Sequence, residues 1–182
     1  MNPLFSIHAG EYLTGGFIQH NFPNCRVWLP TRDTGIDLLV TNAKRTRTIS
    51  LQVKFSKDFL PHSKDKFELH SLIVATWYKV KRKALVSSEA DYWVFLLRSF
   101  AHGTTDYLVV SPQDLLSRFS AYHGKKATYD LYFSLNVKKQ CWEVRGLNNA
   151  EKVAVASGRF HVRERNFTEF LNKWSAIEKL NR

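Results

Sequence analysis

The sequence predicts one α/β domain, and three observations lead to this class. The chain has 182 residues, which suits a single domain with a sizeable core. A hydrophobic content of 44% excludes a disordered or fibrous chain. Short alternating apolar runs are interspersed with stretches of helical periodicity, and no internal repeat, low-complexity tract or linker divides them. We therefore treat residues 1–182 as one domain.

The first element is a predicted helix over residues 6–20, with Ser6 as its cap. Glu11 falls on the same face as Thr14 and Ile18, at helical spacings of three and four residues. This face should point to the core, where an unpaired carboxylate is costly. Glu11 therefore needs a partner or a function.

The rest of the first half predicts three strands, a helix and a fourth strand. Short alternating runs indicate the three strands, a polar stretch with Pro61 indicates a loop, and a second helix ends in a basic cluster. A nearly continuous apolar run then indicates a central strand buried on both faces. These elements cover residues 25–30, 36–41 and 48–55 (strands), 56–66 (loop), 69–85 (helix) and 91–99 (strand).

The second half predicts a smaller α+β region. It contains a strand over 106–111 and a helix over 111–122 capped by Ser111, with Pro112 in its first turn. Residues 129–137 and 140–146 are expected either to form a hairpin or to flank a longer segment that leaves the sheet. Residues 166–181 predict an amphipathic helix with a capping box of Asn166 and Glu169 and an apolar stripe through Phe167, Phe170, Leu171, Trp174, Ile177 and Leu180.

The net charge of the chain indicates which class of partner it favours. The chain carries 27 Lys and Arg against 16 Asp and Glu, a formal charge of +11, which favours a polyanion such as nucleic acid. No apolar run is long enough for a membrane helix, and the N-terminus lacks the pattern of a secretory signal. Cys25 and Cys141 are far from any CxxC spacing, so we expect two buried, reduced thiols and a cytoplasmic protein.

Two strands place polar side chains on one face. Asp37 points away from the apolar side of its strand, and Gln52 and Lys54 point away from the apolar side of the next. If the two strands pair, these three side chains lie close together. The first helix, packed on this polar face, would bring Glu11 to the same point.

Such a cluster suits a magnesium ion. Glu11, Asp37, the Gln52 side-chain oxygen and the Val53 carbonyl are oxygen ligands, and Mg²⁺ takes few protein ligands and keeps several waters. We expect Mn²⁺ to substitute for Mg²⁺. Lys54 would hold or help deprotonate a water and counter the charge of a phosphate. The sequence thus predicts metal-assisted phosphodiester hydrolysis.

Each residue also has an ordinary structural explanation. Asp37 alone would cap a turn, and Gln52 and Lys54 alone would form an exposed face. Glu11 would pair with a nearby arginine such as Arg26. It is the occurrence of all four in order, on the expected elements of a basic chain, that favours the metal site.

On these residues the chain resembles the PD-(D/E)XK nuclease superfamily. Glu11 on a helix, Asp37 on a strand and the "QVK" run of residues 52–54 on the next strand match its motif. The order of elements over residues 6–98 matches its restriction-endonuclease-like αβββαβ core with a central mixed sheet, and residues 100–182 are then a C-terminal α+β extension. The resemblance implies a Mg²⁺-dependent DNA endonuclease.

The chain departs from the family motif at two places. Gly35 and Ile36 precede Asp37 where the motif has a proline, as in the resolvase-like branch. Gln52 replaces the acidic residue of the second half-motif, which keeps a carbonyl ligand but removes a charge. The alternative is therefore a DNA-binding protein of the same fold without cleavage activity.

Basic clusters predict where DNA would lie. We expect contacts from Lys44, Arg45 and Arg47 in the turn between the two motif strands, next to the proposed site, and from Lys79, Lys81, Arg82 and Lys83 at the end of the second helix. One site cuts one strand, so a homodimer is the simplest way to cut a duplex.

Overall fold

The computed structural model describes residues 8–31, 34–60 and 70–181. Its elements, in chain order, are α1 (Ala9–Asn21), β1 (Cys25–Trp28), β2 (Leu38–Asn42), β3 (Thr48–Phe55), β4 (Leu72–Lys81), α3 (Arg82–Val86), β5 (Tyr92–Arg98), β6 (Thr105–Val110), α4 (Pro112–His123), β7 (Thr128–Asn136), β8 (Cys141–Glu143), α5 (Asn149–Ser157), η2 (Arg163–Arg165), η3 (Thr168–Phe170), α6 (Ser175–Glu178) and η4 (Lys179–Asn181).

The fold is α/β with a mixed central sheet, as predicted. Among the described residues, the central sheet has five strands in the order β1-β2-β3-β5-β6, and a second sheet has three in the order β4-β7-β8. β3 and β5 run parallel, while the other neighbouring strands of both sheets are antiparallel. The predicted hairpin of the second half is confirmed as the β7–β8 pair.

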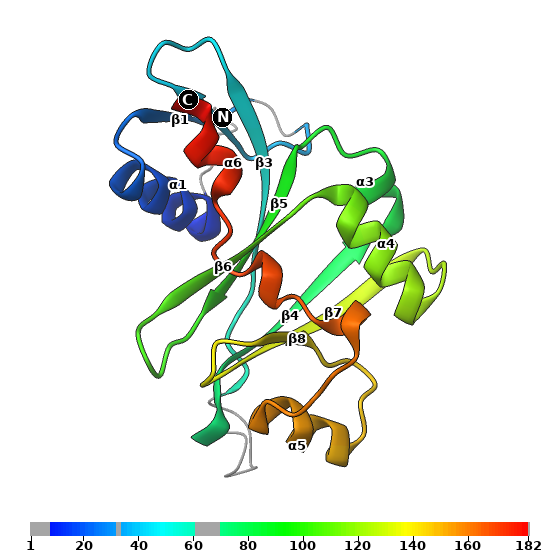
Figure 1. Ribbon diagram of the computed structural model, residues 1–182. Helices are drawn as coiled ribbons and strands as arrows, with labels where there is room; N and C mark the ends of the chain where they lie inside the picture. Colours follow the sequence, from blue (N-terminus) through cyan, green and yellow to red (C-terminus); the bar gives the residue numbers. More distant parts are fainter. Residues whose placement is uncertain (1–7, 32–33, 61–69, 182) are drawn as a thin grey trace, which may run out of the picture.

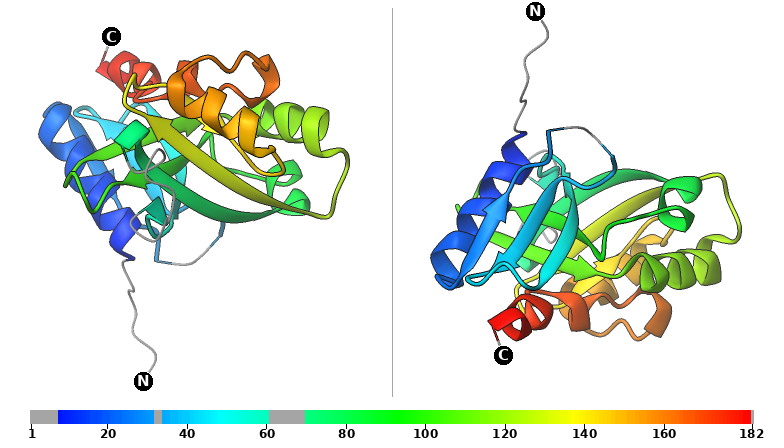
Figure 2. Two further views of the ribbon diagram at one scale, coloured as in Figure 1. Left: turned by 90° about the horizontal axis from the view of Figure 1, so that it is seen from below. Right: turned by 90° about the horizontal axis from the view of Figure 1, so that it is seen from above.

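The central sheet is covered on both faces. One face packs on α1 and the C-terminal segment, in a cluster that includes Ile18, Leu51, Val94 and Trp174. The other face packs on the inner side of the second sheet and on α4. β5 is therefore buried on both faces, as its continuous apolar run predicts. Figures 1 and 2 show α1 and α6 on one side of the molecule and α4 on the other.

The predicted helix over residues 69–85 is wrong. Residues 72–81 form β4, in which buried and more exposed positions alternate along the strand. Val74, Tyr78 and Val80 face the core, whereas Trp77 and Lys79 face outward. This period of two, with β-branched and aromatic residues, suits a strand, and β7 supplies the backbone partners. His70 and Ser71 are helical, and residues 82–86 form the short helix α3.

The predicted helix over residues 166–181 is also wrong. The segment contains the single turns η3, α6 and η4. Asn172 interrupts it with a positive φ of 52° and bonds to both backbone groups of Tyr107 on β6, donating from its backbone N–H and accepting at its Oδ1. The Asn166 side chain accepts from the N–H of Thr168, and Glu169 pairs with Arg118. The aromatic residues of the predicted stripe are nevertheless buried.

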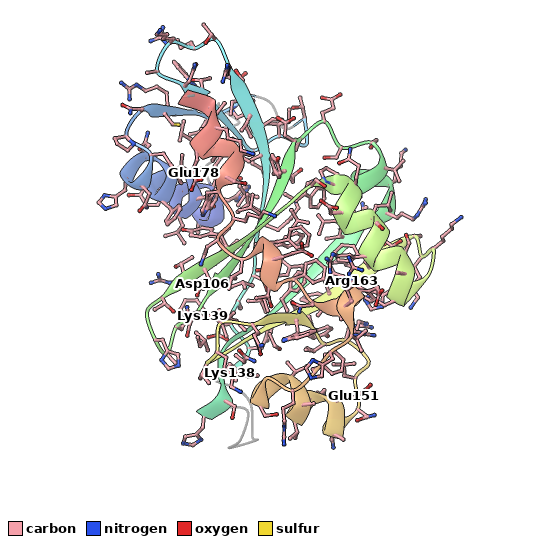
Figure 3. The ribbon with its side chains drawn as sticks, in the orientation of Figure 1. Asp106, Lys138, Lys139, Glu151, Arg163 and Glu178 are labelled. Carbon is pink, nitrogen blue, oxygen red and sulfur yellow. The ribbon has the colours of Figure 1, made fainter. Side chains whose placement is uncertain are left out.

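Two polar contacts tie the second sheet and the C-terminal segment to β6. Asp106 accepts bonds from the Lys139 ammonium, at 2.9 and 3.1 Å, and from the Asn172 amide at 2.9 Å. Lys139 lies in the β7–β8 turn, and Figure 3 shows it beside Asp106. The Asp106 carboxylate is almost fully buried, so these bonds compensate the loss of its hydration.

Smaller predictions are confirmed or fall outside the described residues. α4 begins as predicted, with the Ser111 side chain accepting from the N–H of Asp114. Cys25 and Cys141 are both buried. Ser6, the predicted cap of the first helix, lies outside the described residues, and α1 begins after His8. Within the described part of the chain, no helix has the length and apolar composition that a bilayer crossing requires.

Candidate active site

The β2–β3 hairpin sets the geometry of the predicted cluster. Leu38 pairs with Leu51, so Asp37, one residue earlier, lies opposite Gln52. Asp37 lies just before β2 and stays bonded to β3, because its N–H donates to the Leu51 carbonyl at 2.8 Å, one residue out of the register of the ladder. Side chains of opposed residues share a face, so Asp37 and Gln52 meet. The predicted pairing of the two motif strands is confirmed.

Asp37 is held through one of its two oxygens. Its Oδ2 accepts a short bond from the Gln52 Nε2 and a bond of 2.6 Å from the Val53 N–H. Gln52 and Val53 are 8% and 7% exposed, so both donors are largely shielded from water. Neither of these bonds involves the Oδ1 of Asp37, so among the described residues this oxygen is available to a ligand.

The backbone of β3 presents a further oxygen on the same side. The Leu51 carbonyl accepts from Asp37 and the Val53 N–H donates to Asp37, so alternate residues of β3 present their backbone groups toward β2. The N–H and C=O of one strand residue point to the same side. The Val53 carbonyl therefore points to the side of β3 on which Asp37 lies.

Glu11 and Lys54 complete a single pocket. A pocket of about 630 Å³ is lined by Glu11, Asp37, Gln52 and Lys54, together with His8, Ala9, Gly10, Val53 and Phe55. The structure thus brings together all four side chains that the sequence singles out. Their catalytic roles remain predictions.

The predicted packing of the first helix on the polar face of the sheet is wrong, although Glu11 still lines the pocket. α1 packs on the apolar face of the sheet, where Ile18 lies in the same cluster as Leu51. A Cβ on Gly10 would lie 2.7 Å from the Cβ of Phe55, so only glycine allows this approach of α1 to β3. Glu11 enters at the helix start and accepts from the His8 N–H at 3.2 Å.

Lys54 is positioned by a tryptophan that the sequence did not indicate. Its ammonium lies 5.2 Å from the centre of the Trp93 ring, a cation–π contact. Trp93 lies opposite Gln52 on β5, and its indole N–H donates to Ser88 at 2.9 Å. Because β3 and β5 meet by a parallel pairing across forty residues of chain, no local pattern could reveal this contact.

Ser50, the third polar residue on this face, has a structural role. Its hydroxyl and its backbone N–H each contact the Asp91 carboxylate at 2.8 Å, just before β5 begins. Ser50 is buried and does not line the pocket. The polar face of β3 thus serves folding at one end and the pocket at the other.

The prediction that one basic cluster lies next to the site is wrong. Lys44, Arg45 and Arg47 lie in the turn before β3 begins, whereas the pocket is at the other end of that strand. At roughly 3.3 Å per residue, about 20 Å of strand separates the turn from Lys54. Arg45 lies over the Trp28 ring, and Arg47 donates to the Lys179 carbonyl.

The other basic cluster lies on different elements from those predicted. Lys79 and Lys81 are exposed on β4, and Arg82 and Lys83 begin α3. Lys79 and Lys81 share the outer face of the second sheet, because strand residues two apart point the same way. A contact of these residues with DNA remains a prediction.

Comparison with known proteins does not assign the chain to a family. No family model, no curated protein and no solved structure matches the chain. Among the described residues there is also no group of three or more His, Cys, Asp or Glu side chains suited to a metal. The pocket contributes two carboxylates, one amide and one directed backbone carbonyl, so its function has to be argued from these groups.

Proposed function

We propose that the protein is a Mg²⁺-dependent DNA endonuclease with a PD-(D/E)XK-type site. The observation that carries the proposal is the pocket in which Glu11, Asp37, Gln52 and Lys54 meet. Two carboxylates and a lysine at the end of a strand pair, in a chain of charge +11, suit a phosphodiester substrate.

The oxygen atoms of the pocket fit a hard cation that keeps most of its waters. The Oδ1 of Asp37, the Glu11 carboxylate and the Val53 carbonyl are the groups that would hold it. When bound, Mg²⁺ lowers the pKa of a coordinated water and offsets negative charge on the phosphate. Gln52 fixes Asp37 through the bond from its amide nitrogen, so it acts here as a positioning residue.

The chain's own residues supply the remaining electrostatics. The ammonium of Lys54, held against Trp93, would contact a phosphate oxygen and orient the attacking water. The start of α1 also lines the pocket, and the N–H groups of a helix start favour an anion. Glu11 satisfies the N–H of His8.

The arrangement of strands supports the same class of fold. α1 and β1–β3 are followed by β5, which returns parallel to β3. β4 and the short α3 replace the crossover helix expected of an αβββαβ core. We include in the proposal a cytoplasmic location and a homodimer, since one site cuts one strand.

A binding protein without cleavage activity is the second candidate. It is favoured by the orientation of the Gln52 amide, whose nitrogen faces Asp37 and whose oxygen would lie 3.7 Å from a Cβ placed on Gly35. In this orientation Gln52 supplies no ligand oxygen, so the pocket has one metal ligand fewer than the sequence predicts.

Cleavage of several DNA forms separates the two candidates. The wild-type protein should be incubated with supercoiled plasmid, linear duplex, single strands and a four-way junction, with Mg²⁺, with Mn²⁺ and with EDTA. We expect at least one form to be nicked with either metal and none with EDTA. Binding without any nicking in Mg²⁺ or Mn²⁺ would favour the second candidate.

A further inference from the structure

The outer face of the second sheet exposes aromatic side chains on neighbouring strands. Trp77 on β4 lies directly opposite Tyr132 on β7, and the two are 37% and 40% exposed. Opposed residues of an antiparallel pair have Cβ atoms about 5 Å apart. Two large, partly exposed aromatic side chains thus stand side by side on the β4–β7 pair, whose strands are neighbours in Figure 1.

Positive charge surrounds this aromatic pair. Lys79 and Lys81 follow Trp77 on the same face of β4, and both are exposed. Arg145 lies over the Tyr132 ring, 5.4 Å from its centre, and pairs at 3.8 Å with Asp130, the residue opposite Lys79. With Lys152, the four cations outnumber this one carboxylate.

A groove extends the face beyond Tyr132. It has a volume of about 530 Å³, and Tyr132, Arg145 and Lys152 line it with the exposed Phe59. This volume is typical of a small-ligand pocket. Cations and aromatic side chains therefore line this face from β4 across β7 to α5.

A hydrogen bond links the strand that carries Trp77 to the chain that leaves the candidate active site. Phe55 lines the active-site pocket, and the next residue, Ser56, accepts a bond of 3.4 Å from the N–H of Trp77. The chain then follows the edge of β4, where the N–H of Phe59 donates to the Ala75 carbonyl at 2.7 Å. The backbone of Trp77 is thus bonded to the residue that follows the pocket-lining Phe55.

We infer that this face binds single-stranded nucleic acid, with bases stacked on Trp77 and Tyr132 and phosphates held by Lys79, Lys81, Arg145 and Lys152. Stacking suits unpaired bases, because those of a duplex have both of their faces covered. The net positive charge of the face selects a polyanion over an apolar or cationic partner. The inference concerns binding alone and holds whether or not the pocket cleaves.

The test measures binding in EDTA, so that cleavage plays no part. Fluorescence anisotropy with labelled oligo(dT) and oligo(U) compares the wild-type protein with Trp77→Ala/Tyr132→Ala. We expect each aromatic side chain to contribute on the order of tenfold in Kd, and the double variant about 100-fold. The oligonucleotide bound more tightly identifies whether DNA or RNA is preferred. Arg145→Gln should lower the salt slope by about 0.7.

Two controls make the result specific. Trp28→Ala removes another exposed tryptophan. Trp28 is 44% exposed, lies on the edge strand β1 of the central sheet beside Arg45, and its replacement should leave oligo(dT) affinity unchanged. Duplex affinity should change less than about threefold in the double variant. The inference is overturned if the double variant binds oligo(dT) like the wild type, or if duplex affinity falls by the same factor.

Discussion

Asp37→Asn is expected to abolish cleavage while leaving the fold intact. Both hydrogen bonds that the Asp37 carboxylate accepts from the described residues go to Oδ2, so the single oxygen of asparagine can take that place and satisfy Gln52 and Val53. The amide nitrogen then occupies the position of Oδ1, where it cannot bind a cation. Loss of several kcal/mol of metal-derived stabilisation corresponds to a rate reduction of about 10³-fold.

The measurement compares initial cleavage rates and thermal unfolding of three proteins. Asp37→Asn should unfold at nearly the wild-type temperature. Asp37→Ala leaves two shielded donors without their acceptor and should lose about 1–3 kcal/mol in the free energy of unfolding. An Asp37→Asn protein that cleaves at the wild-type rate would show that the Oδ1 of Asp37 is no metal ligand.

Lys54→Met is expected to have the second largest effect. Methionine keeps an unbranched side chain over Trp93 but removes the ammonium, so packing is retained and the charge is lost. We expect cleavage to slow by about 10²–10⁴-fold, as for loss of a positioned proton-transfer or electrostatic group. DNA binding should weaken only slightly, with a salt slope smaller by about 0.9 for one phosphate contact.

Two further variants show whether charge or position matters at Lys54. Lys54→Arg keeps the positive charge and the contact with the ring but alters the donor geometry, so binding should recover and cleavage only in part. Lys57→Met removes an exposed lysine three residues along the chain and should leave the rate unchanged. Equal cleavage by Lys54→Met and the wild type would exclude Lys54 from the site.

Sequence patterns predicted the β2–β3 hairpin and its polar face because both features are local. Alternation assigns side chains to faces, and a short turn places Asp37 opposite Gln52. The same pattern could not show at which end of the hairpin the pocket opens. The turn with Lys44, Arg45 and Arg47 was therefore expected beside the site, although it lies at the far end.

The two incorrect helices depend on partners distant in the sequence. β4 is a strand because β7, more than forty residues later, pairs with it, and because the central sheet helps to bury Tyr78 and Val80. The C-terminal segment bends at Asn172 because Tyr107 offers its backbone there. Apolar spacing alone shows that Phe167 and Trp174 are buried but not which backbone conformation buries them.

Mn²⁺ binding, measured by electron paramagnetic resonance, tests the metal site most directly, because it requires neither substrate nor turnover. The wild-type protein should bind Mn²⁺ saturably and release it when Mg²⁺ is added. Asp37→Asn should lose this binding. Glu178→Gln, which alters an exposed carboxylate on α6, should retain it. If the wild-type protein holds no more Mn²⁺ than Asp37→Asn does, the pocket is not a metal site.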